Sequence, residues 1–328
     1  MRPARLVLTE LARTGTGLLV ASMLSCARTE SPASAHVDIT GAGGTFPYPL
    51  YRAWFSEYGQ KNNVRINYLS VGSQEGLRLL SQGEVDFGAT DIPYVAPISA
   101  KTRCVSVAIP MVSGVIAIAY NLPGAGSSAL NFDARTLAGI FSGAIKRWDD
   151  ERVRSLNPAA TLPAARIVVV HRGKGSGTGH AFAAYLASRG GWSVPSDTNG
   201  VQWPVGIAAE GNESVAAEVK ATQHALGFME LTYARQNHLA VGAVRGSSSG
   251  FVVPGADALD YPIRTNTWIV VDPARVPAAR GAALVAFIRW ALESGSEQAR
   301  ALEYAPATAD TVAHYDSLLR AMSFGSCP

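Results

Sequence analysis

Apolar residues follow two different spacings along the chain, and the two spacings alternate. Val64, Ile66 and Tyr68 fall at every second position, which predicts a strand with one buried face. Between residues 50 and 58 the apolar positions recur every three or four residues, which predicts an amphipathic helix. Further strands are predicted at 36–40, 85–88 and 166–170, and further helices near 77–80, 181–185 and 284–292. Strands that alternate with helices favour an α/β fold with a parallel sheet.

The first 25 residues carry a different pattern. Three arginines and one glutamate precede a short apolar stretch, Gly17–Leu24. A basic start, a short apolar core and a small residue before the cleavage point are typical of an export signal. The stretch is too short for a membrane-spanning helix, which needs about 20 apolar residues. We therefore predict a signal peptide at 1–25, a polar tether at 26–35, and a mature protein in the periplasm or at the cell surface.

If the protein is exported, its three cysteines lie in an oxidising compartment. Cys26 follows the apolar stretch and resembles the lipidated N-terminal cysteine of bacterial lipoproteins, although Met23 stands where such signals usually have leucine. Lipid anchoring through Cys26 and ordinary cleavage both stay open. Cys104 and Cys327 are the other two cysteines, and leftover cysteines in an oxidising compartment often pair. A disulfide between them is therefore possible, and sequence alone does not decide it.

Composition and charge narrow the class of protein. A hydrophobic content of 48% over 328 residues excludes an intrinsically disordered chain and leaves room for one large or two medium domains. The formal net charge is +3, and removal of residues 1–25 lowers it to +1. No run of lysines and arginines provides a surface that could follow a phosphate backbone, so we expect no nucleic-acid partner.

Three predicted strand-to-helix turns are rich in glycine and hydroxyl residues: Gly43–Phe46, Gly72–Gly76 and Gly173–Thr178. Small residues let the backbone approach a ligand, and the start of the following helix offers unpaired N–H groups that favour anions. Arg172 precedes the third turn and adds a forked cationic donor suited to a tetrahedral oxyanion. A single such turn is often only a helix cap. Three of them with an adjoining arginine indicate an anion site.

Motifs for catalysis or cofactor binding do not match. The third turn lacks the P-loop spacing because Lys174 precedes the relevant glycines, and His180 occupies the third glycine position of a dinucleotide fingerprint. The six histidines show no metal-binding spacing. Ser176 has glycines as immediate neighbours rather than at the spacing of a nucleophile elbow. A nucleotide-binding enzyme is therefore poorly supported, and the sequence shows no catalytic, metal-binding or cofactor-binding motif.

Motifs spread in order from about residue 38 to about residue 305 resemble the periplasmic phosphate-binding protein family of phosphate ABC transporters. The most specific are GAGGTFP at 41–47, VDFGATD at 85–91 and GSGT at 175–178, with further matches at 141–143, 146–150, 203–206, 211–213 and 226–230. The resemblance implies an α/β fold of two lobes, like a type II periplasmic binding protein, with the ligand in the cleft between them. It also implies crossover strands near Ile109–Pro110 and Tyr261–Pro262, lobe I at 36–108 and 263–328, and lobe II at 109–262.

For function, the resemblance implies high-affinity capture of inorganic phosphate outside the cytoplasm by a monomeric binding protein. Such a protein is not an enzyme, so the resemblance implies no catalytic residues, no metal and no cofactor. Delivery would be to the membrane permease and ATPase subunits of a phosphate ABC transporter. Two alternatives stay open: another oxyanion such as arsenate, molybdate or sulfate, and a secreted phosphatase, although no activated nucleophile or metal cluster supports hydrolysis. The phosphate ligands implied motif by motif are Thr45, Phe46 (through its backbone amide), Ser73, Asp91, Arg172, Ser176, Gly177 and Thr178.

Three residues at this implied site have open roles. Asp91 would repel an anion unless the anion carries a proton, as phosphate does at neutral pH and sulfate does not, so it would select phosphate. The alternative is that Asp91 caps the following turn. Lys174 stands where the family usually has an acidic residue, and it either faces solvent or strengthens the local field. His171 either tunes the site or packs at a strand end.

Overall fold

The computed structural model describes residues 36–94, 106–126, 128–248 and 250–325. The expected signal peptide, the tether, and Cys26, Cys104 and Cys327 lie outside these ranges. The lipid anchor and the disulfide therefore stay predictions. Within the described ranges, no helix is both long enough and apolar enough to cross a membrane.

The N-terminal part of the chain enters a sheet whose first three strands are parallel. β1 (Val37–Gly43) lies between β2 (Val64–Ser70) and β3 (Phe87–Thr90) and pairs with both. α1 (Tyr48–Asn62) follows β1 and α2 (Ser73–Gln82) follows β2, as the alternating spacing of apolar residues predicts. The first two glycine-rich turns therefore lie where a strand passes into a helix.

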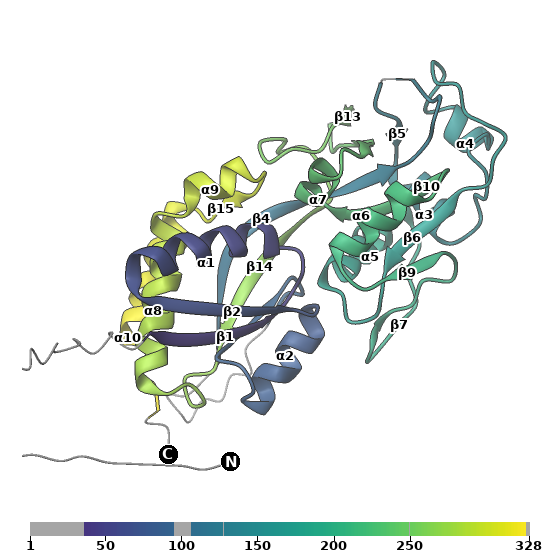
Figure 1. Cartoon of the computed structure of the whole chain (residues 1–328). Helices are drawn as coiled ribbons and strands as arrows, with labels where there is room; N and C mark the ends of the chain where they lie inside the picture. Colours follow the sequence, from purple (N-terminus) through teal and green to yellow (C-terminus); the bar gives the residue numbers. More distant parts are fainter. Residues whose placement is uncertain (1–35, 95–105, 127, 249, 326–328) are drawn as a thin grey trace, which may run out of the picture. The chain divides into compact units, whose positions relative to one another are not determined.

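Two long strands continue this sheet. β14 (Arg264–Val271) pairs antiparallel with β3 and with β4 (Val107–Tyr120), so β4 and β14 lie side by side (Figure 1). The first part of β4, as far as Val115, pairs with β14. From Ile116 onward β4 pairs antiparallel with β10 (Ala225–Glu230). β4 therefore belongs to two groups of strands and connects them.

The second group extends from β10. β6 (Val168–Arg172) is parallel to β10, and β9 (Ile207–Ala209) is parallel to β6. α5 (Gly177–Gly190) follows β6, and α6 (Asn212–Ala221) follows β9. The third glycine-rich turn therefore lies between β6 and α5, at the carboxyl end of a parallel strand.

Short strands and further helices complete the described ranges. Among them, α8 (Ala278–Glu293) packs on β1, and α10 (Ala309–Ala321) packs on α8. The helices are α3 (Ala134–Phe141), α4 (Glu151–Arg154), α7 (Leu231–Gln236), α8 (Ala278–Glu293), α9 (Ser296–Ala301) and α10 (Ala309–Ala321). The strands are β5 (Asn131–Phe132), β7 (Ser196–Asp197), β8 (Gly200–Val201), β11 (Ala240–Val241), β12 (Ala243–Arg245), β13 (Phe251–Val252) and β15 (Ala305–Pro306).

The α/β class is confirmed, but two details predicted from the sequence are wrong. The central strands are antiparallel, because the chain leaves the first group of strands through β4 and returns through β14. The strand predicted at 36–40 is also longer, because β1 continues through Gly41 as far as Gly43. Gly41 is needed for packing instead, because a Cβ there would lie 2.1 Å from the ring of Phe87.

Buried aromatic side chains fix the helices that carry the turns. On α1, Tyr51 and Trp54 are buried, with their ring centroids 5.8 Å apart. On α5, Phe182 lies 4.3 Å from Phe228 of β10, centroid to centroid, and both are fully buried. Each such side chain contributes about 1.5–3 kcal/mol by leaving water. The N-termini of α1 and α5 are therefore held firmly against their sheets.

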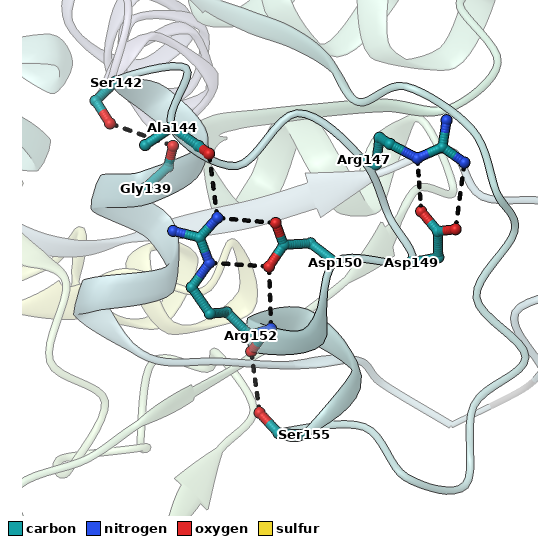
Figure 2. A network of polar contacts seen from close by, with 8 residues as sticks. All are labelled: Gly139, Ser142, Ala144, Arg147, Asp149, Asp150, Arg152 and Ser155. Atoms are coloured by element: carbon teal, nitrogen blue, oxygen red, sulfur yellow. Dashed lines mark hydrogen bonds and ion pairs between the residues drawn. The ribbon is translucent and has the colours of Figure 1, made fainter.

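Two surface ion pairs lie in the segment that runs from α3 into α4 (Figure 2). Arg147 donates through Nε to Asp149 at 2.9 Å, and Arg152 donates through Nη2 to Asp150 at 2.8 Å. These contacts lower the pKa of both aspartates. Trp148, between Arg147 and Asp149 in the sequence, is buried and donates from Nε1 to the carbonyl of His224 at 3.0 Å. The tryptophan anchors the segment, and the exposed ion pairs only shape its surface.

Candidate functional site

The second and third glycine-rich turns meet in space. Gln74 donates its backbone N–H to the carbonyl of Gly175 at 3.1 Å. A Cβ added to Gly177 would lie 2.4 Å from Ser73 Oγ and 2.9 Å from Asp91 Oδ2. Residues from β3, α2 and α5 therefore surround one point, and only glycine fits at position 177 in this arrangement.

Tyrosine hydroxyls orient the first turn. Tyr68 donates to the carbonyl of Gly44 at 2.9 Å, and Tyr233 donates to the carbonyl of Thr45 at 2.8 Å. Because a peptide unit is planar, fixing a carbonyl also fixes the N–H on the opposite side of that unit. These two contacts therefore set the directions of the Thr45 and Phe46 N–H groups. Tyr304 holds the next carbonyl, that of Phe46, at 2.7 Å.

Asp91 is a buried carboxyl at the end of β3, only 1% exposed. Ser73 Oγ donates to its Oδ2 at 3.4 Å, while Oδ1 has no hydrogen-bond partner among the described residues. Burial raises the pKa of Asp91 to about 7, and the nearby Thr267 hydroxyl and the charge of Arg172 oppose this shift. Asp91 thus presents an unpaired acceptor whose protonation state changes near neutral pH.

Arg172 is a buried cation at the end of β6, only 2% exposed. Its Nη2 donates to the carbonyl of Glu210 at 2.6 Å, and its Nη1 donates to Thr178 Oγ1 at 3.3 Å. Its Nε is buried without a partner among the described residues. Burial lowers the pKa of Arg172, and the charge of Asp91 opposes this most strongly. Because an arginine side chain stays protonated in proteins, the site combines a fixed positive charge with an unpaired donor.

The start of α5 supplies further donors. Ser176 is the N-cap, and its Oγ accepts from the Gly179 N–H at 3.0 Å. Gly177 and Thr178 are the first two residues of the helix, so their N–H groups have no partner within it. The hydroxyl of Ser176 therefore serves as a helix cap while its hydrogen stays free to donate.

The two predicted modulators differ in their surroundings. Lys174 is exposed, as the solvent-facing alternative requires, and has no ion-pair partner within the described ranges. Negative charge near Arg172 comes from Glu213 and Glu210 as well as Asp91. His171 is buried, which lowers its pKa, and its Nδ1 lies 3.0 Å from the carbonyl of Arg172. Its surroundings are those of a packed strand-end histidine.

Asn212 lies in the matched motif at 211–213, but no role at the site was predicted for it. It is fully buried at the start of α6, and its Nδ2 donates to Thr45 Oγ1 at 2.8 Å and to Thr178 Oγ1 at 3.2 Å. The asparagine therefore links the first turn to the third. Its signal in the sequence is weak: a polar residue directly after Gly211 at a helix start, which is also typical of ordinary capping.

Across residues 36–94, 106–126, 128–248 and 250–325, no three or more histidine, cysteine, aspartate or glutamate side chains lie together as metal ligands would. The donors that gather at the site are instead backbone N–H groups, hydroxyls and one guanidinium, which together suit an oxyanion.

Comparisons with known proteins agree with this geometry. Residues 29–294 match the family model described as PBP superfamily domain. The phosphate-binding protein PstS of Haemophilus influenzae is 32% identical over 303 residues, which cover 84% of this chain and 90% of that protein.

Two solved structures share the fold. A high affinity periplasmic phosphate-binding protein (PfluDING) bound with phosphate aligns with a TM-score of 0.70 at 19% identity, covering 88% of this chain and 96% of that one. An ABC-type phosphate transport receptor from Vibrio cholerae aligns with a TM-score of 0.59 at 18% identity, covering 82% and 100%. The chain belongs to the PBP superfamily and, within it, to the family of the phosphate-binding proteins PstS.

Proposed function

We propose that this protein binds inorganic phosphate outside the cytoplasm and delivers it to the permease and ATPase subunits of an ABC transporter. The observation that carries the proposal is that the site holds two buried atoms without a hydrogen-bond partner among the described residues: a donor, Arg172 Nε, and an acceptor, Asp91 Oδ1. At neutral pH, phosphate has oxygens that can accept from the arginine and a proton that it can donate to the carboxylate. The names of its relatives, phosphate-binding protein and phosphate transport receptor, support the same ligand.

The proposed ligand set follows from this chemistry. The N–H groups of Phe46 and Gly177, the hydroxyls of Thr45, Ser73, Ser176 and Thr178, and the Arg172 guanidinium donate to phosphate oxygens, and Asp91 accepts from a phosphate hydroxyl. Sulfate at neutral pH carries no proton, so a charged Asp91 facing it would leave a buried acceptor unpaired and two negative charges opposed. Phosphate is therefore preferred over sulfate and molybdate, while arsenate, which is also protonated, competes.

The proposed division into lobes follows the strands. Lobe I comprises 36–108 and 263–328, and lobe II comprises 109–262, with the ligand between them. Thr45, Ser73 and Asp91 come from lobe I, whereas Arg172, Ser176, Gly177 and Thr178 come from lobe II, so closure of the lobes completes the site. The direct contacts between the second and third turns support this arrangement.

The remaining parts of the proposal concern location and activity. A signal peptide at 1–25 exports the chain, and Cys26 carries the lipid that holds it at the membrane. The protein acts as a monomer that binds and releases phosphate without hydrolysing an ester, because the gathered residues include donors for an anion and no activated nucleophile.

Calorimetric titration of the purified protein with phosphate, sulfate, arsenate and molybdate tests the ligand. We expect tight binding of phosphate, competition by arsenate, and at least about 100-fold weaker binding of sulfate. A chromogenic phosphate ester, assayed with and without added divalent metal, tests the phosphatase alternative. Sulfate binding as tight as phosphate binding, or ester turnover that survives further purification, would contradict the proposal.

A further inference from the structure

Asn212 uses every polar atom of its side chain. Its Nδ2 group donates to Thr45 Oγ1 at 2.8 Å and to Thr178 Oγ1 at 3.2 Å, and its Oδ1 accepts from the Glu230 N–H at 3.0 Å. Its own backbone N–H also donates to Thr45 Oγ1, at 3.1 Å. One fully buried amide thus joins Thr45, which is 167 positions away in the sequence, to Thr178, which is 34 positions away.

The orientation of this amide follows from its partner on β10. A backbone N–H can only donate, so the side-chain atom facing the Glu230 N–H has to be the oxygen. The NH₂ group then has to face the two threonines. The direction of donation from Asn212 to the hydroxyls is therefore fixed by the backbone of the neighbouring strand.

This direction determines what the hydroxyls can do. A hydroxyl group has two lone pairs and one hydrogen. Thr45 Oγ1 accepts two N–H donors from Asn212, and Thr178 Oγ1 accepts from Asn212 and from Arg172 Nη1. With both lone pairs of each oxygen in use, the hydrogen of each hydroxyl has to be donated to a third group.

We propose that Asn212 is a positioning residue that makes the hydroxyls of Thr45 and Thr178 obligatory donors to the bound anion. The inference rests on the proposed function, because it assigns these hydrogens to the phosphate oxygens. Asn212 itself does not touch the ligand. It acts through the two threonines and holds the turn before α1 to the start of α5 while they bind.

Selectivity separates this role from that of Asp91. Donors set by Asn212 serve any oxyanion, since phosphate and sulfate both accept hydrogen bonds. Loss of Asn212 should therefore weaken phosphate and sulfate binding by the same factor. A change at Asp91 should instead change the ratio between the two anions.

A double-mutant cycle tests the positioning role. Asn212→Ala and Thr178→Val, alone and combined, are titrated calorimetrically with phosphate. Each single variant should bind about 10-fold or more weakly, the effect of one lost hydrogen bond to a charged group. If Asn212 acts through the hydroxyl, Thr178→Val should cost about twofold or less in the Asn212→Ala background, because the hydroxyl is then no longer fixed as a donor.

Asn157→Ala is the matched control. Asn157 is also buried, and it makes hydrogen bonds to Asn131 and Val153, away from the three turns. Its removal should lower the melting temperature and leave phosphate affinity unchanged. If Asn212→Ala does not fold, Asn212→Ser replaces it in the cycle, because serine keeps a small polar side chain but cannot reach both threonines.

The titrations distinguish failure of the proposed function from failure of the positioning role of Asn212. Wild-type protein that does not bind phosphate would overturn the proposed function and this inference together. Wild-type protein that binds phosphate, with effects of Asn212→Ala and Thr178→Val that multiply, would overturn the inference alone. Non-multiplying effects with an unchanged phosphate-to-sulfate ratio support it.

Discussion

At the scale of single residues, the proposed role of Asp91 is to select which anion binds. Asp91→Asn keeps the size of the side chain and adds an NH₂ donor in place of an acceptor. We expect sulfate affinity at pH 8 to rise about 10-fold or more relative to phosphate affinity, because the unpaired acceptor and the opposing charge are both removed. Competition calorimetry with the two anions measures this ratio.

Asp86→Asn is the control for this substitution. Asp86 is also buried, but it pairs with Arg280 at 3.0 Å and accepts from the Thr40 N–H at 2.9 Å, outside the candidate site. Its variant should keep the wild-type ratio. An unchanged ratio in Asp91→Asn would show that Asp91 does not read the proton of the ligand and would favour the capping role.

The same carboxyl makes stability depend on pH in the absence of ligand. The pKa of Asp91 is raised from 3.8 to about 7 in the folded protein. Between these values the folded state holds a proton that the unfolded chain has lost, so this contribution is complete below pH 4 and disappears as pH rises through 7. The loss amounts to a few kcal/mol, on the order of 1.4 kcal/mol per pKa unit.

Thermal melts of phosphate-free protein at several values between pH 4.5 and 8 test this sign. The melting temperature of the wild type should fall relative to that of Asp91→Asn as pH rises, because asparagine does not titrate. A constant difference between the two proteins across this range would contradict a raised pKa for Asp91.

At this scale, the sequence predicts which residue types can bind an anion better than it predicts which residues contact one another. The glycine-rich turns and Arg172 stand out because their residue types suit an anion wherever they occur. Asn212 lies in a matched motif, but its role could not be predicted, since its importance comes from Thr45, which is 167 positions away. No local pattern encodes a contact of that range. The tyrosine contacts to the carbonyls of Gly44, Thr45 and Phe46 are hidden for the same reason.

At the scale of elements, the close approach of α5 to α2 and β3 depends on one missing side chain. A Cβ at position 177 would lie 2.4 Å from Ser73 Oγ and 2.7 Å from Asp91 Cβ. We expect Gly177→Ala to weaken phosphate binding about 10- to 100-fold, because a misfit of this kind typically costs about 1–3 kcal/mol. Calorimetric titration measures the loss.

Gly179→Ala is the matched control on the same helix. A Cβ there would meet Ser176 Cβ at 3.4 Å, an ordinary van der Waals contact. Alanine favours a helix over glycine by about 1 kcal/mol, so this variant should melt slightly higher and bind phosphate as the wild type does. Equal affinities for the two alanine variants would mean that α5 can shift without loss of the site.

Elements themselves were largely predictable, because apolar spacing reports which face of a helix or strand is buried. The order and direction of the strands were not. The antiparallel pairing of β4 with β14 joins segments that are far apart in the sequence, since β4 ends at Tyr120 and β14 begins at Arg264. Gly41 shows a related limit: glycine indicates a turn locally, whereas here it makes room for Phe87 inside a sheet.

At the scale of the whole molecule, charge is nearly balanced, and the position of a cation matters more than the number of cations. The chain without residues 1–25 carries a formal charge of +1, so it cannot attract phosphate strongly from a distance. Arg172 is buried and Lys174 is exposed on the same turn. Comparison of the two side chains therefore distinguishes a charge that acts in a buried site from a charge that solvent and salt screen.

Lys174→Gln and Arg172→Gln, titrated with phosphate from 0.02 to 0.5 M salt, test this distinction. At 0.15 M salt, screening acts over about 8 Å, so Lys174→Gln should change affinity by no more than about twofold and flatten the salt dependence slightly. Arg172→Gln should lose at least about 100-fold at every salt concentration, because its contacts are charged, buried hydrogen bonds. A large loss in Lys174→Gln that vanishes at high salt would instead assign the lysine to the field of the site, and the exposed turn would then contribute directly to anion capture.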